Sequence, residues 1–136
     1  MSFKLEKYKD EDGLKTNYYD TCIMPSGQTI KIEFQEDWSS DRRYYNIYLV
    51  IMNKRKLNRD TYLKSTGKDG LSSLIWAKQK VKEFEEYIKD RHPETPKTIH
   101  CSWDNGKRRN VYAYGLKGLG YKFGVVFGYK ALYKTV

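Results

Sequence analysis

Cysteine, proline and histidine are scarce in this 136-residue sequence, which contains two cysteines, three prolines and two histidines. Cys22 and Cys101 lie far apart and in no C-x-x-C spacing, so neither a disulfide framework nor a zinc site is indicated and both thiols are expected to be reduced. His92 and His100 have no paired ligand spacing, which excludes a metal site built on them. His100 and Cys101 are neighbours on one predicted strand, where their side chains point to opposite faces, so a Cys-His dyad is not expected.

Long hydrophobic runs are also absent. No apolar stretch approaches the roughly 20 residues that a membrane helix needs, and Met1 to Lys7 lacks the apolar stretch of a signal peptide. We therefore expect no membrane partner and a cytoplasmic location. No internal repeat and no Pro/Gly/Ser linker divides the chain, which predicts a single domain over residues 1–136.

Aromatic residues and positive charge are abundant. The chain has 13 Tyr, 5 Phe and 3 Trp, enough large apolar surface to form a core, and a formal net charge of +9. This charge favours an anionic partner: nucleic acid, a phosphorylated cofactor or an acidic protein surface. Charge alone does not choose among the three, and a soluble lysine-rich surface explains it equally well.

The first half of the chain reads as strands followed by a helix. Residues 18–24 and 29–34 are β-prone and flank the turn residues Pro25-Ser26-Gly27, which predicts a hairpin. Residues 44–52 are apolar on both alternating faces apart from Asn46, as in a central strand. A helix is predicted to begin after Gly70, because apolar residues then recur at three-to-four spacing. Pro93 and Pro96 should end it.

The second half predicts a strand over residues 97–103, a short helix from about Lys107 to Leu119, and two strands between Tyr121 and Tyr133 with a turn near Phe127 and Gly128. The expected fold class is therefore α/β (α+β), with a mixed, mainly antiparallel sheet and two helices in the order β-β-β-α-β-α-β-β.

Two segments resemble motifs of the GNAT family of acetyl-CoA-dependent N-acetyltransferases. The run Lys64-Ser65-Thr66-Gly67-Lys68-Asp69-Gly70-Leu71 is similar to the family's Gln/Arg-x-x-Gly-x-Gly/Ala loop, and Leu116-Lys117-Gly118-Leu119-Gly120-Tyr121 is similar to its Tyr-x-x-x-Gly-Phe. The predicted order of elements from residue 18 onward also looks like the later two-thirds of that fold. In the family, the loop holds the pyrophosphate of CoA through backbone N–H groups at a helix N-terminus, where the helix dipole favours phosphate.

The resemblance implies an enzyme that transfers an acetyl group from acetyl-CoA to an amine substrate. It places the cofactor on Lys64, Thr66, Gly67, Lys68 and Gly70. The sequence departs from the pattern at Asp69, which would repel phosphate, and at Leu116, where the family has the tyrosine that protonates the CoA thiolate.

The remaining catalytic candidates follow from these departures. Tyr112 lies one helical turn before Leu116 on the same side of the predicted helix, and Tyr114 is close by, so either can serve as the acid, with Tyr112 favoured by geometry. Glu33 on the hairpin is the candidate general base, although a solvent-facing strand glutamate is the commoner case.

A non-catalytic basic binding or inhibitor module is the alternative, and such a small chain would also suit a phage or mobile-element accessory protein. Basic residues alternate with tyrosines in a pattern that can bind single-stranded nucleic acid, phosphates through the cations and bases through stacking. They are Arg42, Arg43, Lys54, Arg55, Lys56, Arg59, Lys107, Arg108 and Arg109, with Tyr44, Tyr45, Tyr48, Tyr112 and Tyr114. The same cations could hold the phosphates of CoA, so they do not discriminate between the two functions.

Overall fold

A computed structural model describes residues 3–11, 13–39, 42–52, 60–62, 70–102, 113 and 115–136. The elements with described bounds are, in chain order, β1 (Lys4–Asp10), β2 (Gly13–Ile23), β3 (Thr29–Ser39), β4 (Arg42–Met52), β5 (Asp60–Tyr62), α1 (Gly70–Arg91), β6 (Lys97–Ser102), a 3-10 turn (Lys117–Leu119), β7 (Lys122–Val126) and β8 (Tyr129–Thr135). The described part of the chain is therefore mostly sheet, with one long helix.

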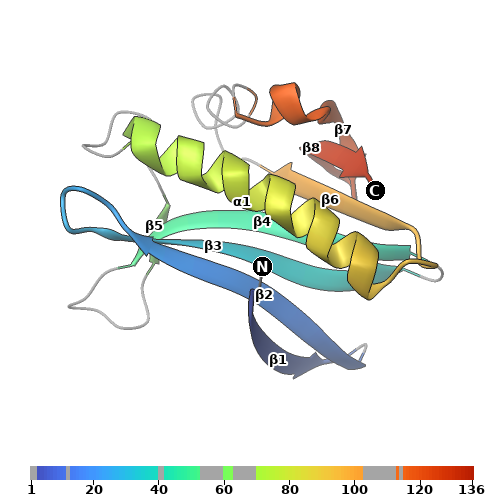
Figure 1. Ribbon diagram of the computed structural model, residues 1–136. Coiled ribbons are helices and arrows are strands. Elements are labelled where there is room, and N and C mark those ends of the chain that lie inside the picture. The colour runs from blue at the N-terminus through green and yellow to red at the C-terminus, as the bar shows by residue number, and fades with distance from the viewer. Residues whose placement is uncertain are drawn as a thin grey trace.

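The strands form a single mixed sheet in the order β1-β2-β3-β4-β6-β8-β7, and the short β5 pairs with β4. Only β4 and β6 pair in parallel; the other described pairs are antiparallel. A parallel pair needs a crossover connection, and α1 lies in that connection, across one face of the sheet (Figure 1). The opposite sheet face is called the far face below.

The predicted hairpin is confirmed as β2 and β3. Met24 and Gln28 close the turn with a backbone hydrogen bond of 2.8 Å, and Gly27 occupies it with a φ of 89°. A positive φ is readily accepted only by glycine, which explains why the turn falls at this point. The hairpin brings alternate apolar residues of β3 onto the face that α1 covers, among them Ile30, Ile32 and Phe34.

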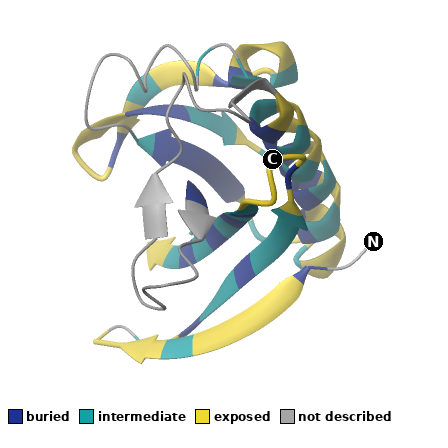
Figure 2. Cartoon of the chain, turned by 90° about the vertical axis from the view of Figure 1, so that its left-hand side faces the viewer, coloured by how far each residue is buried: buried dark blue, intermediate teal, exposed yellow. Residues whose placement is uncertain are grey.

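The helix predicted after Gly70 is also confirmed, and its apolar stripe forms one wall of the core. Phe84 is fully buried and stacks on Phe34 of β3, with ring centroids 3.9 Å apart. Other buried stripe residues are Ala77, Val81 and Ile88. Figure 2 shows the buried residues concentrated between the helix and the central strands, whereas β1 is exposed along most of its length.

The helix ends before the two prolines, as expected. The buried Lys97 ammonium at the start of β6 donates to the carbonyl oxygen of Thr95 at 2.6 Å and to that of His92. A cation just after the helix C-terminus provides hydrogen-bond donors for the carbonyl groups that follow the helix. It also interacts favourably with the negative end of the helix dipole.

The predicted fold class, with two helices in the order β-β-β-α-β-α-β-β, is wrong. Five strands precede α1 in the described part of the chain, because β1 pairs with β2 along its whole length and β5 pairs with the end of β4. The sequence of Lys4–Asp10 does not predict a strand, because charged residues occupy both faces of this segment. Nearly all of its side chains are exposed. Pairing with a neighbour, rather than burial, places this segment in the sheet.

The second predicted helix, from about Lys107 to Leu119, is the other error. Much of that range lies outside the described residues, and its described end is helical at Ala113, Gly115 and Leu116 and then forms the 3-10 turn Lys117–Leu119, which is far shorter than the predicted helix. Gly120 follows in a left-handed conformation with a φ of 92°, and its N–H bonds to the carbonyl of Lys117. Gly115, Gly118 and Gly120 within six residues weaken a regular helix, so the chain turns tightly into β7 instead.

Candidate functional site

The parallel strands β4 and β6 run side by side for only four residue pairs. Pairing begins at Arg43 with Lys97 and ends at Asn46 with His100. On this edge β4 next pairs at Val50, with β5, so the described strands leave the intervening backbone of β4 without a ladder partner. The sheet therefore opens at Ile47, beside the first half of α1.

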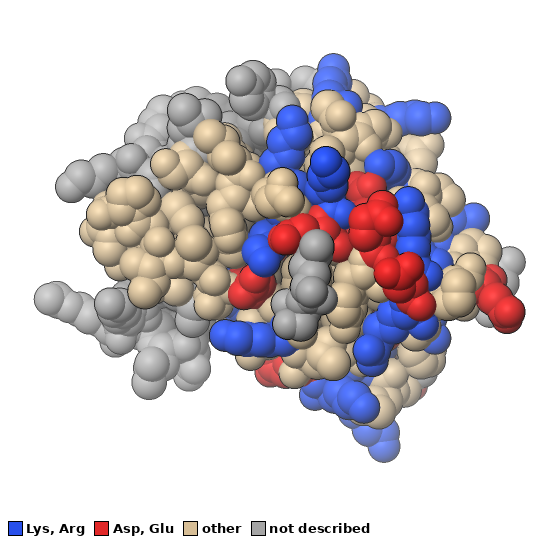
Figure 3. All heavy atoms as spheres, in the orientation of Figure 1, with Lys and Arg blue, Asp and Glu red and all other residues tan. Residues whose placement is uncertain are grey.

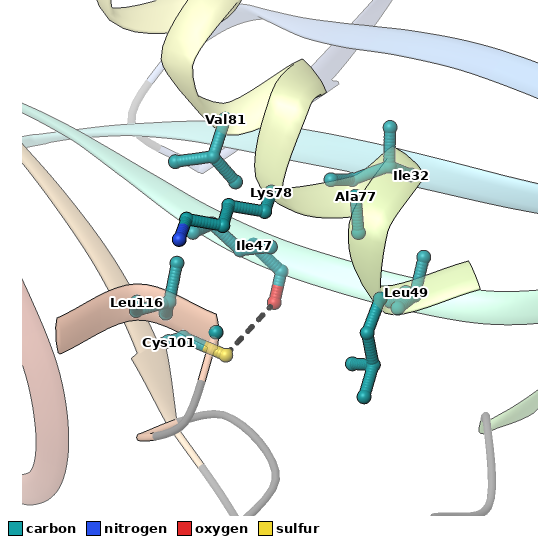
Figure 4. A pocket seen from close by; sticks show the side chains of 10 residues that line it. Ile32, Ile47, Leu49, Ala77, Lys78, Val81, Cys101 and Leu116 are labelled. Atoms are coloured by element: carbon teal, nitrogen blue, oxygen red, sulfur yellow. Dashed lines mark hydrogen bonds between the residues drawn. The ribbon is translucent and has the colours of Figure 1, made fainter. Parts of the chain in front are cut away.

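A small apolar cavity of about 40 Å³ lies where the strands part, on the face covered by α1 (Figure 4). Strands β3, β4 and β6, the helix, and the segment before the 3-10 turn all contribute to it. Its walls are Ile32, Ile47, Leu49, Leu74, Ala77, Lys78, Val81, Cys101, Gly115 and Leu116. Lys78 is the single charged residue among them, so the space suits a narrow, largely apolar group.

Lys78 connects this cavity with a wider surface groove. The groove has a volume of about 920 Å³ and runs between α1 and the 3-10 turn. Its lining residues are Ser72, Ile75, Trp76, Lys78, Gln79, Lys82, Gly118 and Leu119. A Cβ atom on Gly118 would lie 3.1 Å from the Lys78 ammonium, so a glycine there lets the lysine approach closely. The first turn of α1 contains no acidic residue that would offset its positive end.

Cys101 contributes a sulfur atom to the cavity but no nucleophile. Its Sγ lies 3.8 Å from the Ile47 carbonyl oxygen, to which it donates a weak hydrogen bond across the parting strands. Burial raises the pKa of this thiol to about 12. Because the thiolate is the reactive form, Cys101 is inert at neutral pH.

The cofactor residues predicted from the sequence fall mostly outside the described part of the chain. Lys64, Thr66, Gly67 and Lys68 lie there, as do both tyrosine candidates for the acid, Tyr112 and Tyr114. Gly70 is the first residue of α1. Leu116, which the sequence resemblance compares with the tyrosine of the GNAT motif, is buried and lines the cavity.

Glu33, the candidate base, is not brought to this cavity. It lies on β3 next in the chain to Ile32 and Phe34, which are buried beneath α1, so its own side chain belongs to the far face. There its carboxylate accepts a hydrogen bond of 2.9 Å from the Asn17 amide and lies 3.7 Å from the Lys31 ammonium.

The basic and aromatic residues of the alternative function are largely engaged where they are described. Arg43 pairs with the buried Glu36 at 3.2 Å and lies over the Trp38 ring. Tyr45 is fully buried, and its hydroxyl donates to Glu36 at 2.9 Å. Arg42 donates to the Thr98 hydroxyl at 3.2 Å.

The charges on the helix face do not form a single basic field. Figure 3 shows lysines and arginines interspersed with carboxylates over this face. Pairs such as Lys80 with Asp20 and Lys134 with Glu85 account for part of this mixture. The other named basic residues, at positions 54–56, 59 and 107–109, lie outside the described ranges, as do Tyr112 and Tyr114.

Sequence reasoning missed three residues that the fold brings to the place where the strands part. In the sequence, Lys78 is one of several lysines on the polar side of a predicted helix. Only its position opposite Gly118 in the fold distinguishes it from the others. Asn46 and His100 face each other only because β4 and β6 pair in parallel across the helix crossover. The single signal for Asn46 was its polarity in an otherwise apolar strand.

Comparison of the chain with protein-family models, curated proteins and solved structures gives no match. No helix of the described residues is long and apolar enough to cross a membrane. Over those same residues, no three His, Cys, Asp or Glu side chains gather in a way that would hold a metal ion.

Proposed function

We propose that the chain binds acetyl-CoA along the groove and cavity beside α1 and transfers its acetyl group to an amine. The observation that carries the proposal is the position of Lys78, which lines both the apolar cavity and the lysine-bearing groove. A ligand with a thin, largely apolar arm and a phosphorylated end matches these two joined spaces. The proposal keeps the activity implied by the sequence resemblance and does not depend on the two-helix order.

The chain's own residues fit such a ligand in three ways. Lys78 and Lys82 supply ammonium groups in the groove, where they can pair with phosphate oxygens. Ile47, Leu49 and Leu116 exclude water from the cavity. The described strands give the β4 backbone between Asn46 and Val50 no ladder partner on this edge, so its backbone groups can pair with amides of an extended arm, in the manner of an added strand. When bound, acetyl-CoA supplies an acetyl group activated as a thioester.

A thermal-unfolding titration with acetyl-CoA tests the proposal, with ATP as the polyphosphate control. A ligand at about 100 times its dissociation constant stabilises the folded state by roughly 2.7 kcal/mol, which moves the midpoint of a domain this size by several degrees. We expect a saturable rise with acetyl-CoA and a smaller one with ATP. No rise, or an equal rise with ATP, would contradict a specific acetyl-CoA site.

The acid in this reaction stays a prediction from the sequence. Among the described residues, the cavity lining contains no tyrosine, and its one thiol has a raised pKa, so none of these side chains supplies the proton for the departing thiolate. Tyr112 and Tyr114 are the proposed sources. Unchanged turnover in a Tyr112→Phe, Tyr114→Phe double variant would exclude both.

Non-catalytic binding is the second candidate function, and Leu116 is the observation that favours it. This residue lines the cavity, and in the sequence resemblance it takes the position of the family's tyrosine. In that case the basic surface would serve nucleic acid or an acidic protein. Salt separates these partners, because affinity dominated by phosphate contacts falls steeply as salt rises, whereas a protein contact with an apolar centre weakens less.

A further inference from the structure

A second pocket lies on the far face of the sheet, away from α1. It has a volume of about 480 Å³, within the range of small-molecule sites. Strands β3, β4 and β6 and the β7–β8 hairpin contribute to it. Its lining includes Asp37, Asn46, Tyr48, His100, Phe127 and Tyr129. The space lined by these residues is called the far-face pocket.

Two buried polar atoms in the far-face pocket have no hydrogen-bond partner: Asn46 Oδ1 and His100 Nδ1. The two residues are register partners on β4 and β6, so the atoms belong to neighbouring positions of one sheet face. His100 is only 6% exposed. Leaving buried polar groups unpaired is unfavourable, and such groups in native proteins call for an explanation. A ligand that hydrogen-bonds to Asn46 Oδ1 and His100 Nδ1 would explain why they are unpaired in the protein alone.

The charge of the far-face pocket differs from that of the chain. Asp37 is the acidic side chain that points into it, and no lysine or arginine lines it among the residues that the structure describes, although the whole chain has a net charge of +9. The nearby Lys15 ammonium lies 2.6 Å from both Asp10 and Asp37, so one cation faces two carboxylates and the group of three keeps a net negative charge. The far-face pocket therefore disfavours an anion and favours a cation.

Aromatic rings form one side of the far-face pocket. Phe127 packs against Tyr44 and His100, with ring centroids 4.6 Å and 6.1 Å away. Phe127 and Tyr129 remain 51% and 71% exposed, so their rings are accessible. Aromatic faces attract ammonium groups and pack against apolar stems.

We propose that the far-face pocket binds a small primary amine with an aromatic or aliphatic stem. Its ammonium group donates to Asn46 Oδ1 and to the neutral His100 ring, with Asp37 balancing the charge and Phe127 and Tyr129 contacting the stem. This binding site does not depend on the proposed function. The far-face pocket and the apolar cavity lie on opposite faces at the point where β4 and β6 part.

Binding of phenethylamine, measured by calorimetry without any CoA, tests the proposal. Phenylacetate and 2-phenylethanol are the matched anionic and neutral probes. We expect saturable binding of the amine, at least about tenfold weaker binding of the alcohol, and none of the carboxylate. Equal binding of the three probes, preference for the carboxylate, or no binding of the amine would overturn the proposal.

Two asparagine variants locate the site. Asn46→Leu removes the unpartnered acceptor and should weaken amine binding at least about tenfold. Asn17→Leu is the matched control, because Asn17 Oδ1 is also buried without a partner but lies outside the far-face pocket. Asn17→Leu should bind the amine within about twofold of the natural chain. Equal binding by the two variants would contradict the assignment.

Amine binding without acetyl-CoA binding would support the far-face pocket and refute the proposed transferase.

Discussion

Asn46 and His100 are the last residue pair of the parallel ladder, and the residues that follow them, Ile47 and Cys101, already face the cavity on the opposite side of the sheet. The apolar cavity and the far-face pocket therefore both lie where β4 and β6 separate. One is apolar and lies beside α1, and the other is polar and lies on the far face. This relationship underlies both proposals.

The two thiols should differ sharply in reactivity. Cys101 is buried and its pKa is raised to about 12, whereas Cys22 is partly exposed. A thiol-disulfide reagent at pH 8 should therefore titrate one thiol per folded chain and two in denaturant. In a Cys22→Ser variant the fast reaction should disappear. Rapid reaction of both thiols in the folded protein would show that Cys101 is accessible.

Phe84 should be the most sensitive core position on α1. It is fully buried, stacks on Phe34 and meets the rings of Phe3 and Tyr45 edge-on. Phe84→Ala should lower the free energy of unfolding by about 3–5 kcal/mol, measured by urea denaturation. Ile75→Ala on the same helix is the control, because Ile75 is 61% exposed and should lose no more than about 0.5 kcal/mol. Similar losses in the two variants would contradict the described core.

Stability should fall in acid because of His100. Burial lowers the pKa of His100 to about 4, against an opposing effect of Asp37, whereas an unfolded histidine titrates near 6.5. Between about pH 4 and 6.5 the unfolded chain binds a proton that the folded chain does not, so the free energy of unfolding rises with pH across that window. The full effect is roughly 3 kcal/mol.

Urea midpoints between pH 4 and 7.5 measure this dependence in the natural chain, in His100→Gln and in His92→Gln. Burial also lowers the pKa of His92, with Arg43 adding to the effect, so His92 contributes with the same sign. The pH slope should flatten most in His100→Gln. An unchanged slope in that variant would mean that His100 is not buried in its neutral form.

The sequence predicts those parts of the fold whose signals are local. Gly27 marks the β2–β3 turn, and the apolar stripe through Val81 and Phe84 marks α1, because turn chemistry and helical periodicity act within a few residues. The strand at Lys4–Asp10 carries no such signal, since it is held by pairing with β2 and its side chains stay exposed. The parallel pairing of β4 with β6 likewise depends on contacts more than 50 residues apart in sequence.

The candidate site is less predictable than the fold for the same reason. The predicted phosphate loop and tyrosines are recognised by motif, and they lie outside the described residues. Lys78, Asn46 and His100 belong to no motif, and they meet their surroundings only through the helix crossover and the sheet register. Polarity in an apolar strand singles out Asn46, but it does not reveal which residue lies beside it.

Calorimetric titration of CoA into the natural chain, Lys78→Gln and Lys89→Gln tests the central claim most directly. Lys89 is the control because it lies on the same helix, outside the groove, and pairs only loosely with Glu86 at 3.7 Å. We predict that Lys78→Gln weakens binding at least about tenfold, since it removes a charge-assisted contact, and that Lys89→Gln binds within about twofold of the natural chain. Equal affinities in all three proteins, or no binding to the natural chain, would contradict the assignment of CoA to the groove beside α1.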